Sequence, residues 1–324
     1  MKTIFSYHAS HEQFAPSELL KYAVAAESAG FGGISSSDHF HPWSSRQGQS
    51  GFSFAWLGAA MALTSLPYSI VCCPGQRYHP AIVAQAIATL NEMFPGRFMA
   101  ALGSGEALNE SITGEKWPEK TVRNQRLREC YDIVTRLLEG ETVNHNGLVV
   151  TENAKLYTLP GKKPQLICAA VSKETAYWAG AWADGLITTH RPPNELQELI
   201  NVFRSGGGQE KPVYLKVQLS YAENEQKAIE GAHEQWRTNI FSAGLLGDLP
   251  TTAHFDEAAK MVSPEEMHKH VLISDKISQH IDWLTDFVKI GFNGITLHNV
   301  NREQSKFISD FGTHILPALN DIVA

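Results

Sequence analysis

Residues 17–43 of the chain read SELLKYAVAAESAGFGGISSSDHFHPW and contain a helix, a turn, a strand and a loop in succession. The helical pattern ends at Ala29, and Gly30 supplies the left-handed conformation that commonly closes a helix. A short strand then runs over residues 32–37. Similar glycine turns, AWADG at 181–185 and IGFNG at 290–294, precede two other strands. Because this unit recurs, the sequence predicts a parallel sheet covered by helices.

The same alternation extends along the whole chain. Eight short runs are candidate strands, and most of them are almost continuously apolar, as expected for strands that are buried on both faces: 3–8, 32–37, 68–73, 98–103, 165–170, 185–189, 213–222 and 294–299. Helical patterns occur at 17–29, 53–65, 80–93, 119–139, 173–182, 194–205, 223–241 and 277–290. Eight such repeats predict an α/β fold of the (β/α)8 TIM-barrel class, with a doubly wound sheet as the alternative.

Two segments interrupt the alternation. Residues 140–164 contain a predicted hairpin over Thr142–Tyr157. Residues 242–275 contain Gly, Pro and His, with one short helix expected around Asp256–Lys260, and are interpreted as a cover over the barrel. Because no clean linker or repeat divides the chain, residues 1–324 are predicted to form a single domain with these two inserted segments.

The composition is that of an ordinary soluble globular protein, with 43% hydrophobic and 19% charged residues in 324. The net charge of −7 argues against a nucleic-acid partner, which usually meets a basic patch. No apolar run reaches the roughly 18 residues of a membrane span, and the first residues lack the apolar segment of a signal peptide. The four cysteines fit no metal spacing, so a reducing cytoplasm is expected.

The loop that follows the strand at 32–37 is the first candidate for a functional site, because TIM-barrel active sites lie at the C-terminal ends of the strands. It delivers Asp38, His39, His41 and Trp43 within six residues. A histidine beside a carboxylate can take or give a proton near neutral pH, and Trp43 offers a flat wall to an aromatic ligand. Two other interpretations remain open: a capped turn with surface histidines, and a metal site with His39 and His41 as ligands.

Two further strand ends carry suitable residues. In GSGEALNE at 103–110, Gly105 lets a ligand approach the backbone, and Glu106 is either a general acid with a raised pKa or a carboxylate favoured by a helix N-terminus. The run lacks the endings of a phosphate-binding P-loop and of a dinucleotide motif. In AAVSKET at 169–175, Ser172 is the expected N-cap, and the helix start suits either a phosphate or an ordinary capped turn.

Four motifs together resemble the luciferase-like, flavin-dependent oxidoreductase superfamily: SDHFHPW at 37–43, RYHPA at 77–81, FPGR at 94–97 and GSGEALNE at 103–110. The nearest branch is the one that contains the coenzyme F420-dependent glucose-6-phosphate dehydrogenases, and the pattern also resembles an FMN-using offshoot of that branch. The likeness extends over nearly the whole chain. It implies a (β/α)8 barrel with a cofactor ring lying over the strand ends.

The resemblance also implies roles for single residues. His39 would assist proton transfer at a substrate hydroxyl, Glu106 would be the acid near the cofactor, and Trp43 would line the substrate pocket. A non-proline cis peptide behind the ring would fall around Ile70–Val71. The residues expected to bind the cofactor are Asp38, Val71, Cys73, Gly105, Asn109, Ala169, Ala170, Val171 and Ser172.

The resulting prediction is an enzyme: a flavin-type oxidoreductase that performs hydride transfer or monooxygenation on a small organic substrate. FMN is the expected cofactor, with coenzyme F420 as the alternative, and no metal is expected. The lysine of the family's sugar-phosphate site is replaced by Thr189–Pro192, which argues against glucose 6-phosphate as the substrate. A homodimer is expected, with no nucleic-acid or membrane partner. The alternative functions are a non-catalytic flavin-binding barrel and a metal-dependent hydrolase that uses His39 and His41.

Overall fold

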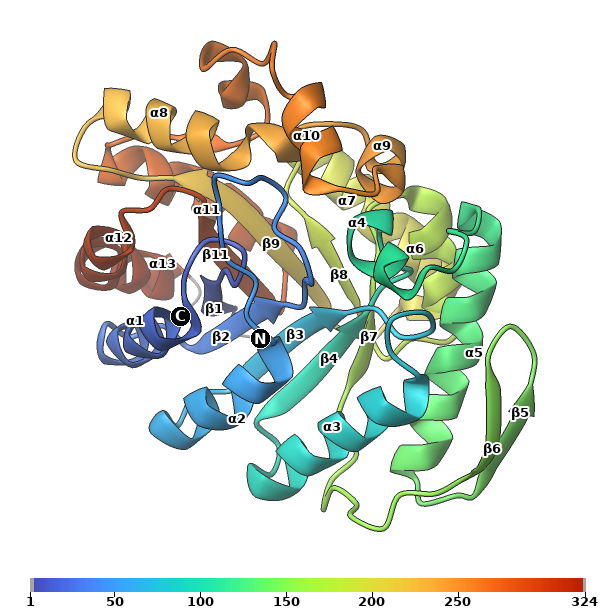
Figure 1. The fold of residues 1–324 in the computed structure, drawn as a ribbon. Coiled ribbons are helices and arrows are strands. Elements are labelled where there is room, and N and C mark those ends of the chain that lie inside the picture. Colours follow the sequence, from blue (N-terminus) through green and yellow to red (C-terminus); the bar gives the residue numbers. More distant parts are fainter. Residues whose placement is uncertain (1–2, 323–324) are drawn as a thin grey trace.

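A closed barrel of parallel strands forms the centre of the computed structural model, which describes residues 3–322 (Figure 1). Within these residues the barrel has eight strands: β1 (Ile4–Ala9), β2 (Gly33–Ser37), β3 (Tyr68–Cys72), β4 (Phe98–Leu102), β7 (Leu166–Ala169), β8 (Leu186–Thr189), β9 (Val213–Ser220) and β11 (Gly294–Asn299). Each strand pairs with the next in this order, and β11 pairs with β1, so the sheet closes on itself. The predicted TIM barrel is confirmed. The first two and last two residues of the domain expected over 1–324 lie outside the described residues.

Helices surround the barrel and follow the predicted pattern. Proline occupies the first turn of α1, α3 and α7, where its missing N–H costs no helical hydrogen bond. The largest difference from the predicted ends is in α8, which ends at Trp236 because a 3₁₀ turn follows it. The helices that match predicted patterns are α1 (Pro16–Ser28), α2 (Ser53–Leu63), α3 (Pro80–Met93), α5 (Lys120–Leu138), α6 (Lys173–Gly180), α7 (Pro193–Phe203), α8 (Glu225–Trp236) and α11 (Ile277–Ile290).

The hairpin in the first inserted segment has the predicted place. Its strands, β5 (Val143–Asn146) and β6 (Val150–Ala154), are antiparallel and lie outside the barrel beside α5 (Figure 1).

The second inserted segment is more ordered than expected. It contains α9 (Ala243–Asp248), α10 (Thr252–Ala258), a 3₁₀ turn at Glu265–Lys269, and β10 (Leu272–Ile273), which pairs with β9. The single helix expected around Asp256–Lys260 has the wrong bounds, because Thr251 caps α10 further upstream by accepting a hydrogen bond from the His254 N–H.

Two helical pieces have no counterpart in the predicted pattern. After β11 the chain continues through α12 (Gln304–Asp310), a π-helical turn at Phe311–Ile315, and α13 (Leu316–Ile322), which complete the eighth repeat. After β4, the single turn α4 (Ala107–Glu110) lies at the mouth of the barrel. The cis peptide expected around Ile70–Val71 is not found, because all described peptide bonds are trans.

The inside of the barrel is chemically divided into two halves. Along β3, β4, β7 and β8 most inward side chains are apolar, with Ser69 and Thr189 as the exceptions: Val71, Met99, Ala101, Ile167, Ala169 and Ile187. Along β1, β9 and β11 the corresponding positions are polar, and the register places Ser6, Thr296 and Lys216 side by side, with His8, Gln218 and His298 nearer the mouth. Barrel interiors are usually filled with bulky branched residues. The polar half therefore points to chemistry at the mouth.

Candidate active site

Asn109 on α4 holds the imidazole of His39 in one orientation. Its Oδ1 accepts hydrogen bonds from the backbone N–H of Phe40 at 2.8 Å and of His41 at 3.3 Å. This places Nδ2 where it donates to His39 Nδ1 at 3.0 Å and to Glu106 Oε2 at 3.3 Å. A ring nitrogen that accepts a hydrogen bond carries no proton, so the proton of neutral His39 is on Nε2.

Glu12, in the loop after β1, faces the other ring nitrogen. Its Oε1 lies 3.3 Å from His39 Nε2 and accepts from Ser37 Oγ at 2.9 Å, while Oε2 accepts from Ser10 Oγ at 2.9 Å. Burial opposes the charge, but His39, Lys216 and the hydrogen bond from Ser37 together hold the pKa of Glu12 below its usual value. Glu12 is therefore an ionised acceptor beside the Nε2–H of His39.

The second carboxyl of the site has the opposite tendency. Burial raises the pKa of Glu106, and the neighbouring Glu12 raises it further, whereas His39 and Lys216 lower it. Two carboxyl groups whose pKa values are pushed apart are a common arrangement for an acid and a base in one active site.

Lys216 of β9 lies inside the barrel beneath this pair. Its Nζ donates to His8 Nε2 at 3.0 Å, and the rings of His8 and His298 are 4.3 Å apart. Burial lowers the pKa of Lys216 to about 8, although Glu12 and Glu106 favour its charged form. Burial also holds the pKa of both histidines well below its usual value, so both are neutral at pH 7.

Asp38 belongs to a charge network at the edge of the site. Its Oδ2 lies 2.8 Å from Arg77 Nη2, and its Oδ1 accepts from Tyr78 Oη at 3.4 Å. The Arg77 backbone N–H donates to Glu110 Oε2 at 2.7 Å. Burial raises the pKa of Asp38 and of Glu110 despite the nearby guanidinium. The network ties the loops after β2 and β3 to α4. The expected contact of Asp38 with a cofactor stays a prediction.

Trp43 forms an apolar wall with Phe255 of α10. The two rings are perpendicular, with centroids 5.2 Å apart, and the Trp43 ring lies 5.1 Å from that of His39. Leu108, Leu246 and Leu249 pack in the same cluster. The inserted segment 242–275 thus reaches the mouth, as a cover would.

The sequence as a whole matches a family model described as luciferase-like monooxygenase over residues 3–294. The chain belongs to this family. An F420-dependent glucose-6-phosphate dehydrogenase from Microbacterium testaceum is 32% identical, with 97% of each chain covered, and one from Mycolicibacterium smegmatis is 31% identical, with 98% of each covered. The solved structure of an F420-dependent secondary alcohol dehydrogenase with an F420-acetone adduct has a TM-score of 0.91 and 30% identity, covering 98% of this chain and 99% of that one.

The comparisons confirm the predicted class, a flavin-type oxidoreductase of the luciferase-like family. A more distant structure, the coenzyme F420-dependent tetrahydromethanopterin reductase from Methanopyrus kandleri, is 20% identical with a TM-score of 0.78, covers 98% of this chain and 99% of that one, and shows the shared fold.

The strand ends next to His39 suit the flat cofactor of a luciferase-like enzyme. Val71 and Ala169 belong to the apolar half of the interior, and a Cβ added at Gly103 would lie 3.8 Å from that of Ala169, so these strand ends form an apolar shelf. At its end Ser172 caps α6 by accepting from the Thr175 N–H at 3.2 Å. An apolar shelf beside a helix start fits a planar ring with a phosphate-bearing tail.

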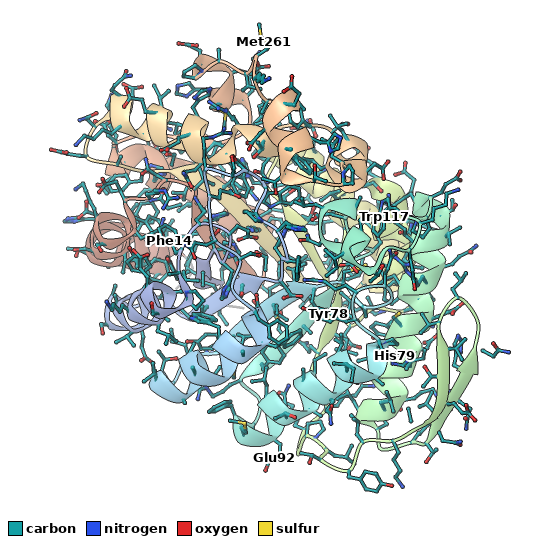
Figure 2. The ribbon with its side chains drawn as sticks, viewed as in Figure 1. Phe14, Tyr78, His79, Glu92, Trp117 and Met261 are labelled. Atoms are coloured by element: carbon teal, nitrogen blue, oxygen red, sulfur yellow. The ribbon has the colours of Figure 1, made fainter. Side chains whose placement is uncertain are left out.

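Gly105 and Cys73 pack against each other at the edge of this shelf. Gly105 has a φ of +83°, and a Cβ there would come within 2.6 Å of Cys73 Sγ and 3.1 Å of the Trp117 ring. Trp117, labelled in Figure 2, lies three residues before α5, and the Arg123 guanidinium of that helix is 4.7 Å from its ring. Only glycine fits this position.

The other residues expected at the cofactor differ in where their side chains point. The side chain of Ala170 joins the main core between the barrel and the helices, so only its backbone can face a ligand. Val171 is 42% exposed at the strand end. The proposed cofactor contacts of the shelf residues remain predictions.

The metal interpretation gains no support from the geometry. His41 Nδ1 lies 2.8 Å from the Leu108 carbonyl, whereas His39 is held by Asn109 and Glu12. In the part of the chain that the structure describes, no group of three His, Cys, Asp or Glu residues is arranged to hold a metal ion.

Glu12 and Lys216 are the site residues that sequence reasoning misses. Glu12 lies four residues beyond His8, in a loop at the correct end of a strand. Lys216 alternates with Leu215 and Val217, and this period of two marks an inward polar position on a strand otherwise read as fully apolar.

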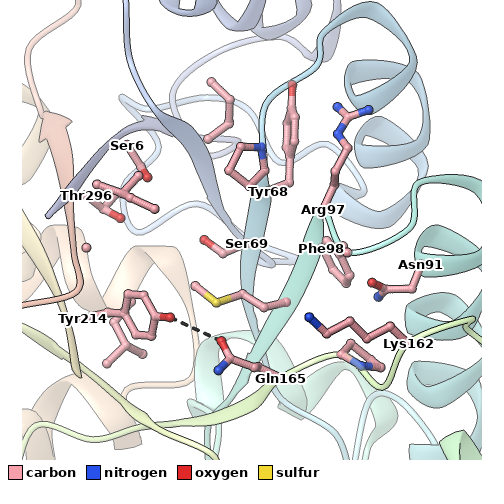
Figure 3. A pocket seen from close by; sticks show the side chains of 18 of the residues that line it. Ser6, Tyr68, Ser69, Asn91, Arg97, Phe98, Lys162, Gln165, Tyr214 and Thr296 are labelled. Carbon is pink, nitrogen blue, oxygen red and sulfur yellow. Dashed lines mark hydrogen bonds between the residues drawn. The ribbon is translucent and has the colours of Figure 1, made fainter. Parts of the chain in front are cut away.

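A cavity of about 260 Å³ opens at the other end of the barrel (Figure 3). Ser6, Ser69 and Thr296 line it, and Tyr214 Oη donates to Gln165 Oε1 at 3.3 Å across its wall. The residues of the candidate site are not among those that line it. No described helix is long and apolar enough to span a membrane.

Proposed function

We propose that this protein is a coenzyme F420-dependent dehydrogenase that interconverts a small hydroxyl compound and the matching carbonyl compound. The relatives at 30% identity or more are named as F420-dependent dehydrogenases. FMN, the cofactor expected first from the sequence, has no such support from them, and the deazaflavin replaces it in the proposal. The observation that carries the reaction type is the position of His39 between Asn109 and Glu12.

The hydrogen bonds around His39 determine how the chain would handle the proton of a substrate hydroxyl. Bound F420 supplies the hydride acceptor. Because Asn109 occupies Nδ1, the substrate oxygen meets the Nε2–H of His39, which donates a hydrogen bond to it. The hydroxyl proton passes to Glu12 Oε1, the ionised oxygen next to that nitrogen. Burial raises the pKa of Glu106, so this carboxyl, on the other side of Asn109, takes up a proton more readily than an exposed one.

The cofactor is tested by titrating the purified protein with F420 and with FMN and following fluorescence. Tight binding of F420 and weak binding of FMN is the expected result, and the reverse would overturn the proposal. Homodimer formation and a cytoplasmic location stay predictions, and sedimentation of the purified protein tests the first.

The reaction is tested by adding isopropanol, propylene glycol, glucose 6-phosphate or a matching ketone to the F420 complex and following the coenzyme's visible absorbance. Glu12→Gln and His39→Ala should each lower turnover by about 10²- to 10⁴-fold, the usual contribution of a positioned acid or base, with the Kd for F420 unchanged. A protein that binds F420 but reacts with none of these compounds would be the non-catalytic barrel.

A further inference from the structure

Lys216 carries hydrogen-bond donors that the protein itself does not use. An ammonium group has three N–H donors and no acceptor. One of them goes to His8 Nε2 at 3.0 Å. Among the described residues, no carboxylate lies within ion-pair distance of Nζ, although Glu12 and Glu106 are near enough to favour its charge. Two donors of a partly buried cation therefore remain for another group.

The position of Lys216 on strand β9 determines where its side chain points. Lys216 pairs in register with Thr296 of β11 and Thr189 of β8, and its side chain points into the barrel. Leu215 and Val217 point the other way, into the core beneath the helices. From this position Nζ reaches upward to His8, one level nearer the mouth, so the ammonium lies at the mouth end of the interior, close to Glu12 and Glu106.

The groups around Lys216 limit what it can hold. His8 and His298 face it from β1 and β11, and both are neutral at pH 7. Glu12 brings one negative charge from the loop after β1. Glu106, across the mouth after β4, is held nearer its neutral form by burial. Two carboxyl groups, Glu12 and Glu106, already lie close to this cation, so a further anion would be repelled by them, whereas an uncharged oxygen would accept the free donors.

We propose that Lys216 is a specificity-determining residue that donates hydrogen bonds to a second, uncharged oxygen of the substrate. The substrate class is then a diol, polyol or hydroxyketone rather than a simple alcohol. This inference rests on the proposed dehydrogenase function and names its substrate class. A site built to hydrogen-bond a substrate oxygen discriminates strongly against analogues without it, because its own polar groups are then left unpaired.

Isopropanol and propylene glycol are the matched probes, since both carry a secondary hydroxyl and differ by one further hydroxyl group. The F420 complex of the wild type should have the lower KM for propylene glycol. In Lys216→Met, which keeps the length of the side chain and removes its donors, the KM for propylene glycol should rise by about 10- to 100-fold, the range expected for a hydrogen bond to a charged group. The KM for isopropanol should stay within about twofold, while kcat should fall to a similar extent for both alcohols because Lys216 also helps to keep Glu12 ionised. Lys216→Arg should recover part of both losses.

Equal changes in KM for both alcohols, or a change in kcat alone, would overturn the assignment, because a merely structural or electrostatic role would not separate the two compounds. A second measurement needs neither turnover nor a variant. The Lys216 amine of the F420 complex is labelled by reductive methylation and quantified by peptide mass spectrometry. Propylene glycol should protect it and isopropanol should not, and equal labelling with both would count against the proposal. If none of the compounds of the reaction test is turned over, the proposed function fails, while the labelling still decides the role of Lys216.

Discussion

Replacing Asn109 by Asp tests whether the amide of this residue sets the protonated nitrogen of His39. The change places an oxygen where Nδ2 now lies, 3.0 Å from His39 Nδ1 and 3.3 Å from Glu106 Oε2. The contacts that Oδ1 makes with Phe40 and His41 N–H can remain, so the loop keeps its anchor. The introduced carboxylate, when ionised, accepts a hydrogen bond from a protonated Nδ1, and neutral His39 then loses the Nε2–H that faces Glu12.

The size of the effect follows from the same distances. Two carboxylates 3.3 Å apart repel by about 5 kcal/mol at an effective dielectric constant near 20, so one of the pair takes up a proton readily. When the introduced carboxyl carries that proton, its O–H can donate to His39 Nδ1 as the amide did. Turnover should therefore be about 10²- to 10⁴-fold below the wild type at high pH, the range of a lost acid–base contribution, and should recover as the pH falls. Asn109→Ala, which has no donor at any pH, should not recover.

The assay combines pH profiles of F420 reduction with ¹⁵N NMR of the His39 ring. The NMR spectrum should show Nε2–H in the wild type and Nδ1–H in Asn109→Asp at high pH. Asn91→Ala is a matched control, because Asn91 is equally buried near the opposite cavity and donates one hydrogen bond to the Ile87 carbonyl. It should lower the free energy of unfolding by about 1 kcal/mol and leave turnover intact. An unchanged tautomer in Asn109→Asp would refute the reasoning.

Three further predictions concern stability. Arg77→Met removes the guanidinium that pairs with the buried Asp38 and Glu110, and it should lower the free energy of unfolding at pH 7 by about 3–5 kcal/mol in urea titrations. This loss should shrink in acid as the two carboxyls protonate. A loss that does not depend on pH would contradict the ion pairing. Glu12→Gln and Glu106→Gln should have opposite effects at pH 7. The lowered pKa of Glu12 stabilises the fold above its unfolded value of about 4.5, whereas the raised pKa of Glu106 destabilises it there, so the first variant should be less stable than the wild type and the second more stable at pH 7. The difference for Glu106→Gln should close as the pH falls towards about 4.5, and that for Glu12→Gln only as the pH falls below it; differences of the same sign at pH 7 would refute this assignment. Gly105→Ala should be more destabilising than Gly96→Ala by about 1–3 kcal/mol in thermal unfolding. Both glycines have positive φ, but only at Gly105 would the added Cβ lie within 2.6 Å of Cys73 Sγ. Equal losses of stability would show that backbone strain alone matters.

The barrel is readable from the sequence because its signals are local. Each strand is a short apolar run, and turns such as Ala29–Gly32 end the helices with glycine. The inserted segment 242–275 is harder to read, because its helices are short and depend on single caps such as Ser242 and Thr251. The helix after β11 is missed although Phe307 and Phe311 are apolar positions of its inner face.

The candidate site is readable only in part, for a physical reason. The motifs at 37–43 and 103–110 contain residue types that are typical of active sites, and these motifs include His39, Glu106 and Asn109. Hydrogen bonds join these three residues in the structure. Glu12 and Lys216 lie in unremarkable local sequence and gain their importance from partners far away in the chain. Such pairings depend on the closure of the barrel, which local patterns do not encode.

The divided interior of the barrel also bears on the order in which the chain folds. The apolar half is built by β3, β4, β7 and β8, which are neighbours in the barrel and follow one another in the chain apart from the hairpin β5–β6. The polar half requires β1 to meet β11, a pairing of Ile4 with Gly294 that spans most of the sequence. Contacts between residues so distant in sequence are slow to form, because closing the long loop between them costs conformational entropy before the contacts can stabilise the structure. The polar cluster of His8, Lys216 and His298 is therefore expected to assemble last, so hydrogen exchange during refolding should protect β3 and β4 before β11.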